Sequence, residues 1–201
     1  MRRPMTRGRP RPRMRRLAAR LCARPRILFV GINPSLRSAE VGHHFAGPGN
    51  PFWRLLHAAK LVPKPCTYED DVRLPAWRLA LTNIVPRATR AASEITPAEF
   101  AAGRVTLARQ ITRVKPRVVA FVGVTVHLAF FGARARGGAG AKPERIGAAR
   151  VFVVPNPSGL NAAYPGFRDK LVWFRRLQRY AAMPAARQRE RVLSRRAACR
   201  L

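Results

Sequence analysis

Four short apolar segments constrain the fold of this chain more than any other feature. They occupy residues 26–32 (RILFVGI), 79–85, 117–123 and 150–155. Apolar runs of this length and continuity are typical of strands that are buried on both faces of a sheet. The sequence therefore predicts a sheet whose strands are buried on both faces.

Segments with helical spacing connect these apolar runs. They lie at residues 51–61, 97–114, 124–132 and 165–182. The start of the second segment is the clearest, because Thr96 can cap its first turn and Glu99 follows three residues later. Residues 133–149 are rich in glycine and are expected to form a loop. Strands that alternate with helices predict a three-layer α/β/α sandwich with a short, mostly parallel central sheet.

The charge of the chain is strongly one-sided, with 40 Lys and Arg against 9 Asp and Glu and a formal net charge of +31. Residues 1–26 contain 11 Arg and no acid. We expect a basic disordered tail at 1–25, a folded domain at 26–182 and a second basic tail at 183–201. Such charge predicts a nucleic-acid partner. The alternative for the tails is a compositional bias, since 35 of the 40 basic residues are Arg.

Several classes of protein are excluded by motifs that the sequence lacks. No apolar run approaches the roughly 18 residues that a membrane helix needs. Cys22, Cys66 and Cys199 form no CxxC pair, which argues against a disulfide framework, a four-cysteine zinc site and an iron–sulfur cluster, and favours a reducing cytoplasm. Neither GxGxxG nor GxxxxGK[ST] occurs. These absences remove the usual dinucleotide-binding and P-loop interpretations.

Two of the predicted strands end in nearly the same sequence. Residues 31–35 read GINPS, and residues 154–159 read VPNPSG. An Asn-Pro pair turns the chain sharply just after a strand. Because ligands of open α/β sheets bind at the carboxyl ends of the strands, both loops are expected to face one cleft.

The first loop and its neighbour contain the best candidates for chemistry. The amide of Asn33 could hold a water molecule, although an Asn in such a turn can instead bond its own backbone. Phe45 lies in a loop rich in Gly and Pro and could stack on a planar ligand such as a base. Alternatively, its ring folds back on Phe52 and Trp53 as part of the core.

Other polar and apolar residues allow a functional and a plain structural interpretation. His43 and His44 are adjacent but lack a third ligand at metal-site spacing, which favours local hydrogen bonding. Asp70 and Asp71 lie in what reads as a surface turn, so we expect solvated charges there rather than a carboxylate metal site. Leu160 could insert into a base stack, or it is an isolated surface leucine.

Together these segments closely resemble the mismatch-specific uracil/thymine-DNA glycosylases, a branch of the uracil-DNA glycosylase superfamily. The resemblance covers roughly residues 26–180. Its motifs are GINPS at 31–35, GHHFAGPGNPFW at 42–53, TNIVPRAT at 82–89, RVVAFVG at 117–123 and NPSGLN at 156–161. Two Asn-Pro loops in the family's order are far more specific than one.

The resemblance implies roles for residues of the first loops. Asn33 matches the family residue that positions the hydrolytic water, and Phe45 matches the aromatic that stacks on the flipped base. The backbone of Ile32 and Phe45 would contact the edges of that base. Asn83 and Thr89 match polar positions that read the pyrimidine.

The resemblance also implies roles for His44 and for the second loop. His44 lies where thymine-active relatives carry a His beside the base pocket. The second loop would grip phosphate, fill the vacated stack and face the orphan guanine. Its DNA-binding residues would be Asn156, Pro157, Ser158, Gly159, Leu160 and Asn161.

Some positions depart from the family pattern. Ser35 replaces a Gly found in many relatives, Pro51 replaces a long polar residue, and Asn161-Ala162 lacks the Arg that some relatives carry. The Asp-based water-activating motif of the most active uracil glycosylases is absent, as are the cysteines of the iron–sulfur branch.

The implied activity is hydrolysis of the N-glycosidic bond of uracil, thymine or a related damaged pyrimidine mispaired with guanine, by base flipping, leaving an abasic site. The resemblance implies that this reaction needs no metal and no organic cofactor. The implied partner is double-stranded DNA with G·U or G·T mispairs, bound by a monomer in the cytoplasm, at the nucleoid. Two alternatives remain open. One is a uracil or damaged-base glycosylase without mispair preference, and the other is a non-catalytic basic DNA-binding protein.

Overall fold

The structure is a computed structural model, and it describes residues 16–132, 135, 137–159 and 161–184 of the 201-residue chain. The strands are β1 (Ile27–Gly31), β2 (Leu79–Asn83), β3 (Val118–Val122), β4 (Gly140–Ile146) and β5 (Ala149–Val154). The α-helices are α1 (Leu36–Val41), α2 (Phe52–Ala58), α3 (Pro97–Val114), α4 (Val124–Phe131) and α5 (Phe167–Ala182). Two 3₁₀ helices, η1 (Tyr68–Trp77) and η2 (Ala92–Glu94), complete the described elements.

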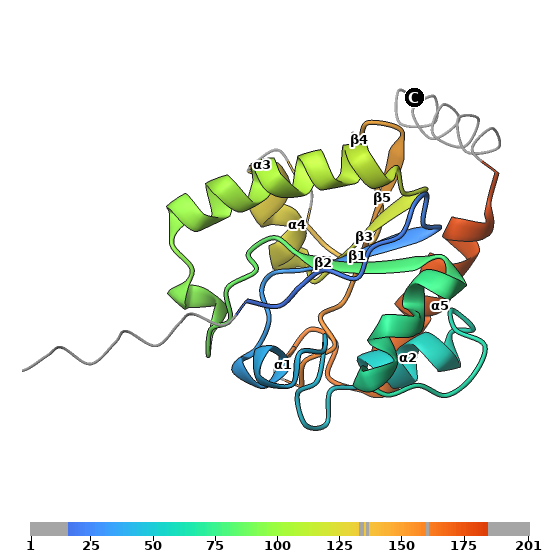
Figure 1. Ribbon diagram of the computed structural model, residues 1–201. Coiled ribbons are helices and arrows are strands. Elements are labelled where there is room, and N and C mark those ends of the chain that lie inside the picture. Colours follow the sequence, from blue (N-terminus) through green and yellow to red (C-terminus); the bar gives the residue numbers. More distant parts are fainter. Residues whose placement is uncertain (1–15, 133–134, 136, 160, 185–201) are drawn as a thin grey trace, which may run out of the picture.

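The five strands form one sheet in the order β2-β1-β3-β5-β4 (Figure 1). The pairs β1–β2, β1–β3 and β3–β5 are parallel, and only β4–β5 is antiparallel. The predicted α/β fold with a short, mostly parallel sheet is confirmed.

Strand β4 corrects the prediction of a loop over residues 133–149. Its side chains alternate between more and less buried positions, because it lies at the edge of the sheet. The four predicted strands are continuous apolar runs, whereas this one shows a one-sided pattern within a glycine-rich stretch. Pairing with β5, rather than its own hydrophobicity, makes this segment a strand.

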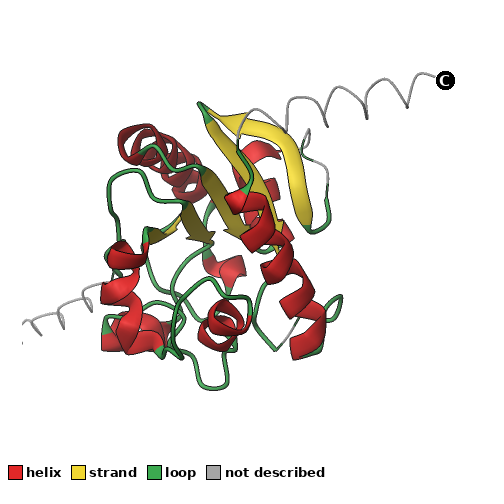
Figure 2. Cartoon of the chain, turned by 90° about the vertical axis from the view of Figure 1, so that its right-hand side faces the viewer, coloured by secondary structure: helices red, strands yellow, loops and turns green. Residues whose placement is uncertain are grey.

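Helices cover both faces of the sheet, as Figure 2 shows. Successive side chains of a strand point to opposite faces. Ile27 and Phe29 of β1 accordingly pack with α2 and α5, and Leu28 and Val30 pack with α3 and α4. Each fully buried side chain of this size stabilises the fold by about 1.5–3 kcal/mol.

Helix α3 begins as predicted. The Thr96 hydroxyl accepts a hydrogen bond from the Glu99 N–H at 3.2 Å, and the Glu99 carboxylate accepts one from the Thr96 N–H at 3.0 Å. Pro97 occupies the first helical position. Glu99 is thereby held at the start of α3, close to the loop that follows β2.

The segment at 16–25 lies against the domain, although it belongs to the predicted N-terminal tail. The backbones of Arg20 and Leu81 exchange two hydrogen bonds of 2.8 Å, which covers the outer edge of β2. Leu17 is buried, and its N–H donates to the Pro86 carbonyl. The remainder of that tail, and the predicted C-terminal tail from residue 185, lie outside the described residues. Among the described helices, none has the length and hydrophobicity needed to cross a bilayer.

Candidate active site

The loops after β1 and β2 meet at the carboxyl ends of these two parallel strands. Ser35, after β1, forms a backbone bridge with Thr89, after β2. The side chain of Asn83 lies directly over Gly31, so that a Cβ on Gly31 would be only 2.4 Å from the Asn83 Oδ1. Gly31 and Asn83 therefore fit together only because the first has no side chain.

Asn33 is half-buried and its amide orientation is determined by its neighbours. The Nδ2 group donates to the Thr89 Oγ1 at 2.6 Å and to the carbonyls of Pro34 and Arg87 at 3.2 and 3.3 Å. Carbonyl oxygens only accept hydrogen bonds, so the NH₂ side of the amide must face them. No hydrogen bond from a described residue reaches Oδ1, which leaves this oxygen as an oriented acceptor.

Thr89 supports this orientation. Its hydroxyl donates to the Ala91 carbonyl at 2.7 Å, so the oxygen lone pairs remain to accept from Asn33. Thr89 is buried. The structure thus places the Thr89 hydroxyl against Asn33, where it makes two protein hydrogen bonds.

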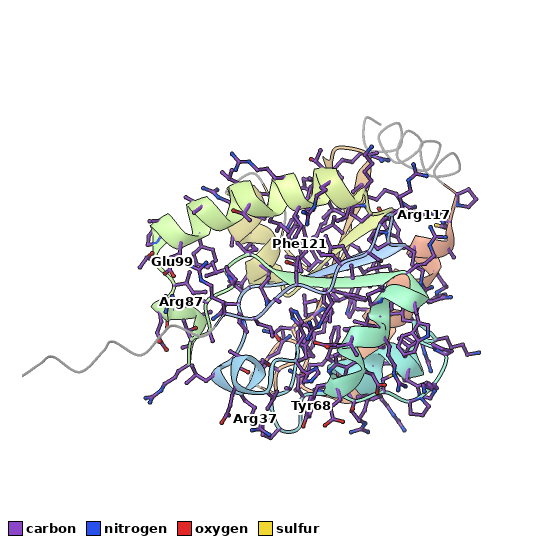
Figure 3. All side chains as sticks on the ribbon, viewed as in Figure 1. Arg37, Tyr68, Arg87, Glu99, Arg117 and Phe121 are labelled. Carbon is purple, nitrogen blue, oxygen red and sulfur yellow. The ribbon has the colours of Figure 1, made fainter. Side chains whose placement is uncertain are left out.

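An ion pair holds the backbone that Asn33 contacts. The Arg87 guanidinium donates two hydrogen bonds to the Glu99 carboxylate, at 2.5 and 2.8 Å, and one to the Glu94 carbonyl at 2.9 Å (Figure 3). The hydrogen bonds from Arg87, followed by those from Thr96, lower the pKa of Glu99 to about 2. This pair anchors the loop after β2 to the start of α3.

Phe45 lies in the loop between α1 and α2 with a left-handed backbone, φ 54°. Its ring stacks on Phe52, with 3.8 Å between centroids and an interplanar angle of 18°. The Phe45 ring therefore packs on Phe52 of the core, which was the structural alternative for this residue. Phe45 is nevertheless only partly buried, so one aromatic face is packed on the core while part of the ring stays accessible.

Two serines link the Phe45 loop to the Asn33 loop. The Ser35 hydroxyl accepts from the Ser38 N–H and donates to the Ser38 hydroxyl, each at 3.1 Å. The Ser38 hydroxyl in turn accepts from the Ala46 N–H at 3.1 Å. Ser35, which departs from the family pattern, is the N-cap of α1 and part of this link.

Asp71 corrects the prediction of a solvated surface charge. Its side chain is fully buried and accepts hydrogen bonds from Arg20 Nε at 3.0 Å and the His44 N–H at 2.9 Å, and it contacts His43 Nδ1 at 3.0 Å. Asp70 instead caps η1 through the Thr67 N–H. A buried carboxylate needs several donors, and here they come from segments that are distant in sequence.

His44 is buried beneath this loop. Its Nε2 lies 3.0 Å from the Ala18 carbonyl, and its own carbonyl accepts from Trp53 Nε1 at 3.2 Å. Burial lowers the pKa of His44, which favours a neutral ring. Within the described part of the chain, no three His, Cys, Asp or Glu residues gather in a way that could hold a metal ion.

The second Asn-Pro loop follows β5 and is built from local hydrogen bonds. The Asn156 Oδ1 accepts from the Ser158 N–H at 3.0 Å, and the Asn156 carbonyl accepts from Asn161 Nδ2 at 3.0 Å. Asn156 and Gly159 are exposed, whereas Pro157 is buried. Leu160 lies outside the described residues.

The structure therefore brings the predicted residues of β1, β2 and the Phe45 loop together at one edge of the sheet. Ile32 is partly buried, and its carbonyl accepts from the Val85 N–H at 2.9 Å. Reasoning from the sequence missed Arg20, Asp71 and Arg87. No local pattern marks them, because their partners are 12 to 51 residues away along the chain.

Comparison with known proteins gives a family match and a structural neighbour. The family model of the uracil DNA glycosylase superfamily matches residues 19–178. The chain is also similar to the solution NMR structure of a candidate uracil DNA glycosylase from Methanosarcina acetivorans. The TM-score is 0.55 at 23% identity, over 82% of this chain and 98% of that one. At this identity the structural match reports on the fold, and the family match carries the relationship.

Proposed function

The chain belongs to the uracil DNA glycosylase superfamily, and from this premise we propose that it hydrolyses the N-glycosidic bond of uracil in DNA, preferring uracil or thymine mispaired with guanine. The observation that carries the proposal is the geometry of Asn33. Three acceptors turn its NH₂ group inward and leave Oδ1 as an oriented acceptor at the carboxyl edge of the sheet. An oriented acceptor is what a positioned water molecule requires.

The proposed reaction begins with extrusion of the target base, which costs least at a mispair. The Asn33 Oδ1 accepts a hydrogen bond from a water whose oxygen forms the new bond to C1′ of the sugar. The C1′–N bond breaks, its electron pair leaves with the base, and a proton from the water completes the free base. A neutral amide orients this water but barely deprotonates it, so the catalytic gain should be modest.

Phe45 is proposed to hold the extruded base. Stacking on Phe52 keeps the ring rigid, and its partial exposure offers a surface for the base. A rigid aromatic platform costs little conformational entropy when a base stacks on it. Asn83 and the backbone of Ile32 and Phe45 are proposed to read the base edges.

We propose that the second Asn-Pro loop contacts DNA and that His44 has a supporting role. Asn156, Ser158, Gly159 and Asn161 would contact the phosphates and the orphan guanine, and Leu160 would fill the vacated stack. His44 would hold the Phe45 loop in place through the hydrogen bonds of its backbone to Asp71 and Trp53. The mispair preference rests on the likeness of these motifs to the mismatch-specific branch. We also propose that the protein acts as a monomer in the cytoplasm.

A substrate panel tests this function. End-labelled duplexes that carry G·U, G·T or A·U, and single-stranded DNA with U, are incubated with wild type and with Asn33→Ala, and alkali then cleaves abasic sites. We expect cleavage at G·U and G·T that exceeds cleavage at A·U and disappears in the variant. Fluorescence anisotropy should show that the variant still binds DNA.

The same panel separates the alternatives. Equal excision from all uracil substrates would identify a glycosylase without mispair preference. Salt-dependent binding without cleavage of any substrate would identify the non-catalytic DNA-binding protein, an alternative that the charge of +31 favours.

A further inference from the structure

Basic side chains also gather at the opposite end of the sheet, where the parallel strands begin. Five of them are exposed, and we call this group the amino-end patch. Its members are Arg24, Arg78, Lys115, Arg117 and Arg145.

Backbone contacts place the first three members side by side. Arg78 Nη2 donates to the Arg24 carbonyl at 3.2 Å. The Arg24 N–H donates to the Val114 carbonyl at 2.7 Å, directly before Lys115. Segments that precede β1, precede β2 and follow α3 therefore converge at this point.

The other two members continue the patch toward β5. The Arg117 N–H donates to the Pro25 carbonyl at 3.0 Å, and the Arg117 carbonyl accepts from the Arg150 N–H at 3.1 Å. Arg145 of β4 pairs with Arg150 in the antiparallel ladder. The patch thus spans the start of the sheet from β2 to β4.

No acidic side chain neutralises these cations within the described residues. The ion pairs of arginine and lysine there join Arg20, Arg37, Arg73 and Arg87 to Asp or Glu, and none includes a member of the patch. The charges also act on their neighbours. Desolvation by burial lowers the pKa of Arg26, and the charge of Arg78 lowers it further. Desolvation also lowers the pKa of Arg150, and the charges of Arg117 and Arg145 act in the same direction.

Helix capping explains only part of this arrangement. Arg78 and Lys115 end η1 and α3, where a cation complements the helix dipole. Arg24, Arg117 and Arg145 end no helix. In addition, Arg24, Arg78 and Lys115 have φ values of 48°, 55° and 51°, a region in which glycine would avoid a cost of roughly 1–2 kcal/mol each.

The patch is far from the candidate active site. Strand β1 has five residues, so about 13 Å separates the Cα atoms at its two ends. Figure 3 shows Arg117 on the opposite side of the molecule from Arg87 and Glu99. A duplex that lies across the Asn33 edge of the sheet therefore leaves the amino-end patch uncovered.

We propose that the amino-end patch binds the phosphate backbone of a second segment of duplex DNA. The guanidinium groups match phosphate oxygens in geometry and charge, and contacts of this kind hold DNA without reading its bases. One molecule can then hold two duplexes and pass between them. This proposal does not depend on the excision chemistry.

A bridging experiment tests the proposal with the full-length protein. A biotinylated duplex on beads is saturated with protein, washed, and offered a second, fluorescent duplex across a range of salt concentrations. The patch variant is Arg24→Gln/Lys115→Gln/Arg145→Gln. These three positions are chosen because the wild-type side chains make no hydrogen bond among the described residues. The matched control removes the same charge from α3 and α5 with Arg104→Gln/Arg109→Gln/Arg175→Gln.

We expect wild type, the control variant and Asn33→Ala to capture the second duplex. In the patch variant, the salt dependence of log K for this capture should fall by about 0.9 for each phosphate that the protein no longer neutralises, and capture should fail at the higher salt concentrations. Its G·U excision and thermal unfolding should match wild type. Capture by the patch variant equal to that of wild type, or no capture by wild type, would overturn the proposal.

Discussion

The two Asn-Pro-Ser loops share a tripeptide and follow two strands of one sheet, β1 and β5, yet their surroundings differ. In the first loop, the Asn33 side chain bonds to the segment after β2, 54 and 56 residues away. In the second loop, Asn156 bonds to Ser158 and Asn161 of its own loop. Asn33 is half-buried, whereas Asn156 is exposed.

The same tripeptide thus has different hydrogen-bond partners in the two loops, and the difference comes from the residues around it. Long-range bonds orient the Asn33 amide before any ligand arrives, which suits chemistry that depends on orientation. Bonds within its own loop hold the second motif without tying it to the rest of the domain. This difference supports the proposal of catalysis at the first loop and DNA contact at the second.

Substituting the two asparagines one at a time should separate the roles of the two loops most clearly. We expect Asn33→Ala to lower the single-turnover excision rate at saturating enzyme by at least about 10²-fold, with an unchanged Kd for DNA. Asn156→Ala should raise Kd and largely preserve the rate. Quench-flow excision and anisotropy titrations on a G·U duplex measure both quantities, and a rate loss of similar size in both variants would refute the division of roles.

The next largest effect is expected at Thr89, whose hydroxyl orients Asn33. Thr89→Val keeps the shape of the side chain but removes the acceptor for Asn33 Nδ2. The loss of one hydrogen bond to a buried group costs roughly 1–3 kcal/mol, so the excision rate should fall about tenfold with little change in Kd.

Thr106→Val is the matched control for this substitution. Thr106 lies on the exposed face of α3, and its hydroxyl bonds only to the Ala102 carbonyl of its own helix. Its excision rate should equal that of wild type. A Thr89→Val protein with the wild-type rate would show that Asn33 keeps its orientation without the hydroxyl.

The fold was predictable because its strands are continuous apolar runs. The predicted segments at 26–32, 79–85, 117–123 and 150–155 overlap β1, β2, β3 and β5. Strand β4 was missed, since an edge strand is stabilised by its neighbour and shows little hydrophobicity of its own.

The candidate site was predictable only where a motif is local. Asn33 and Phe45 lie in loops whose sequences are distinctive by themselves. The buried Asp71 was interpreted as a surface charge, because its donors Arg20 and His43 are 51 and 28 residues away. Whether a carboxylate is buried depends on the tertiary arrangement of its partners, which local sequence patterns do not contain.

A smaller effect is expected from the pair that anchors the loop after β2. Glu99→Gln weakens the hydrogen bonds from Arg87 and should lower the excision rate severalfold, because the Arg87 carbonyl contacts Asn33. The folded-state pKa of Glu99 is about 2, below its usual 4.5. Its contribution to stability is therefore fully present above about pH 5 and is lost as pH falls through about 2.

The measurement is the difference in unfolding midpoint between wild type and Glu99→Gln as a function of pH. This difference should be constant near neutrality and should shrink between pH 4.5 and 2. Glu40→Gln provides the control, since Glu40 pairs with Arg37 across an exposed i,i+3 contact. A difference that does not change with pH would show that Arg87 gains nothing from the charge of Glu99.

The smallest effect on the free protein is expected in the second loop. A Cβ on Gly31 would meet Asn83, whereas a Cβ on Gly159 meets nothing within 4 Å. Gly159→Ala should therefore change the free energy of unfolding by no more than about 0.5 kcal/mol. The same open space is where the DNA backbone is proposed to approach, so the variant should bind a G·U duplex more weakly at an unchanged excision rate. A destabilised variant with normal affinity would mean that the second loop is as closely packed as the first, and the contrast between the two loops would then disappear.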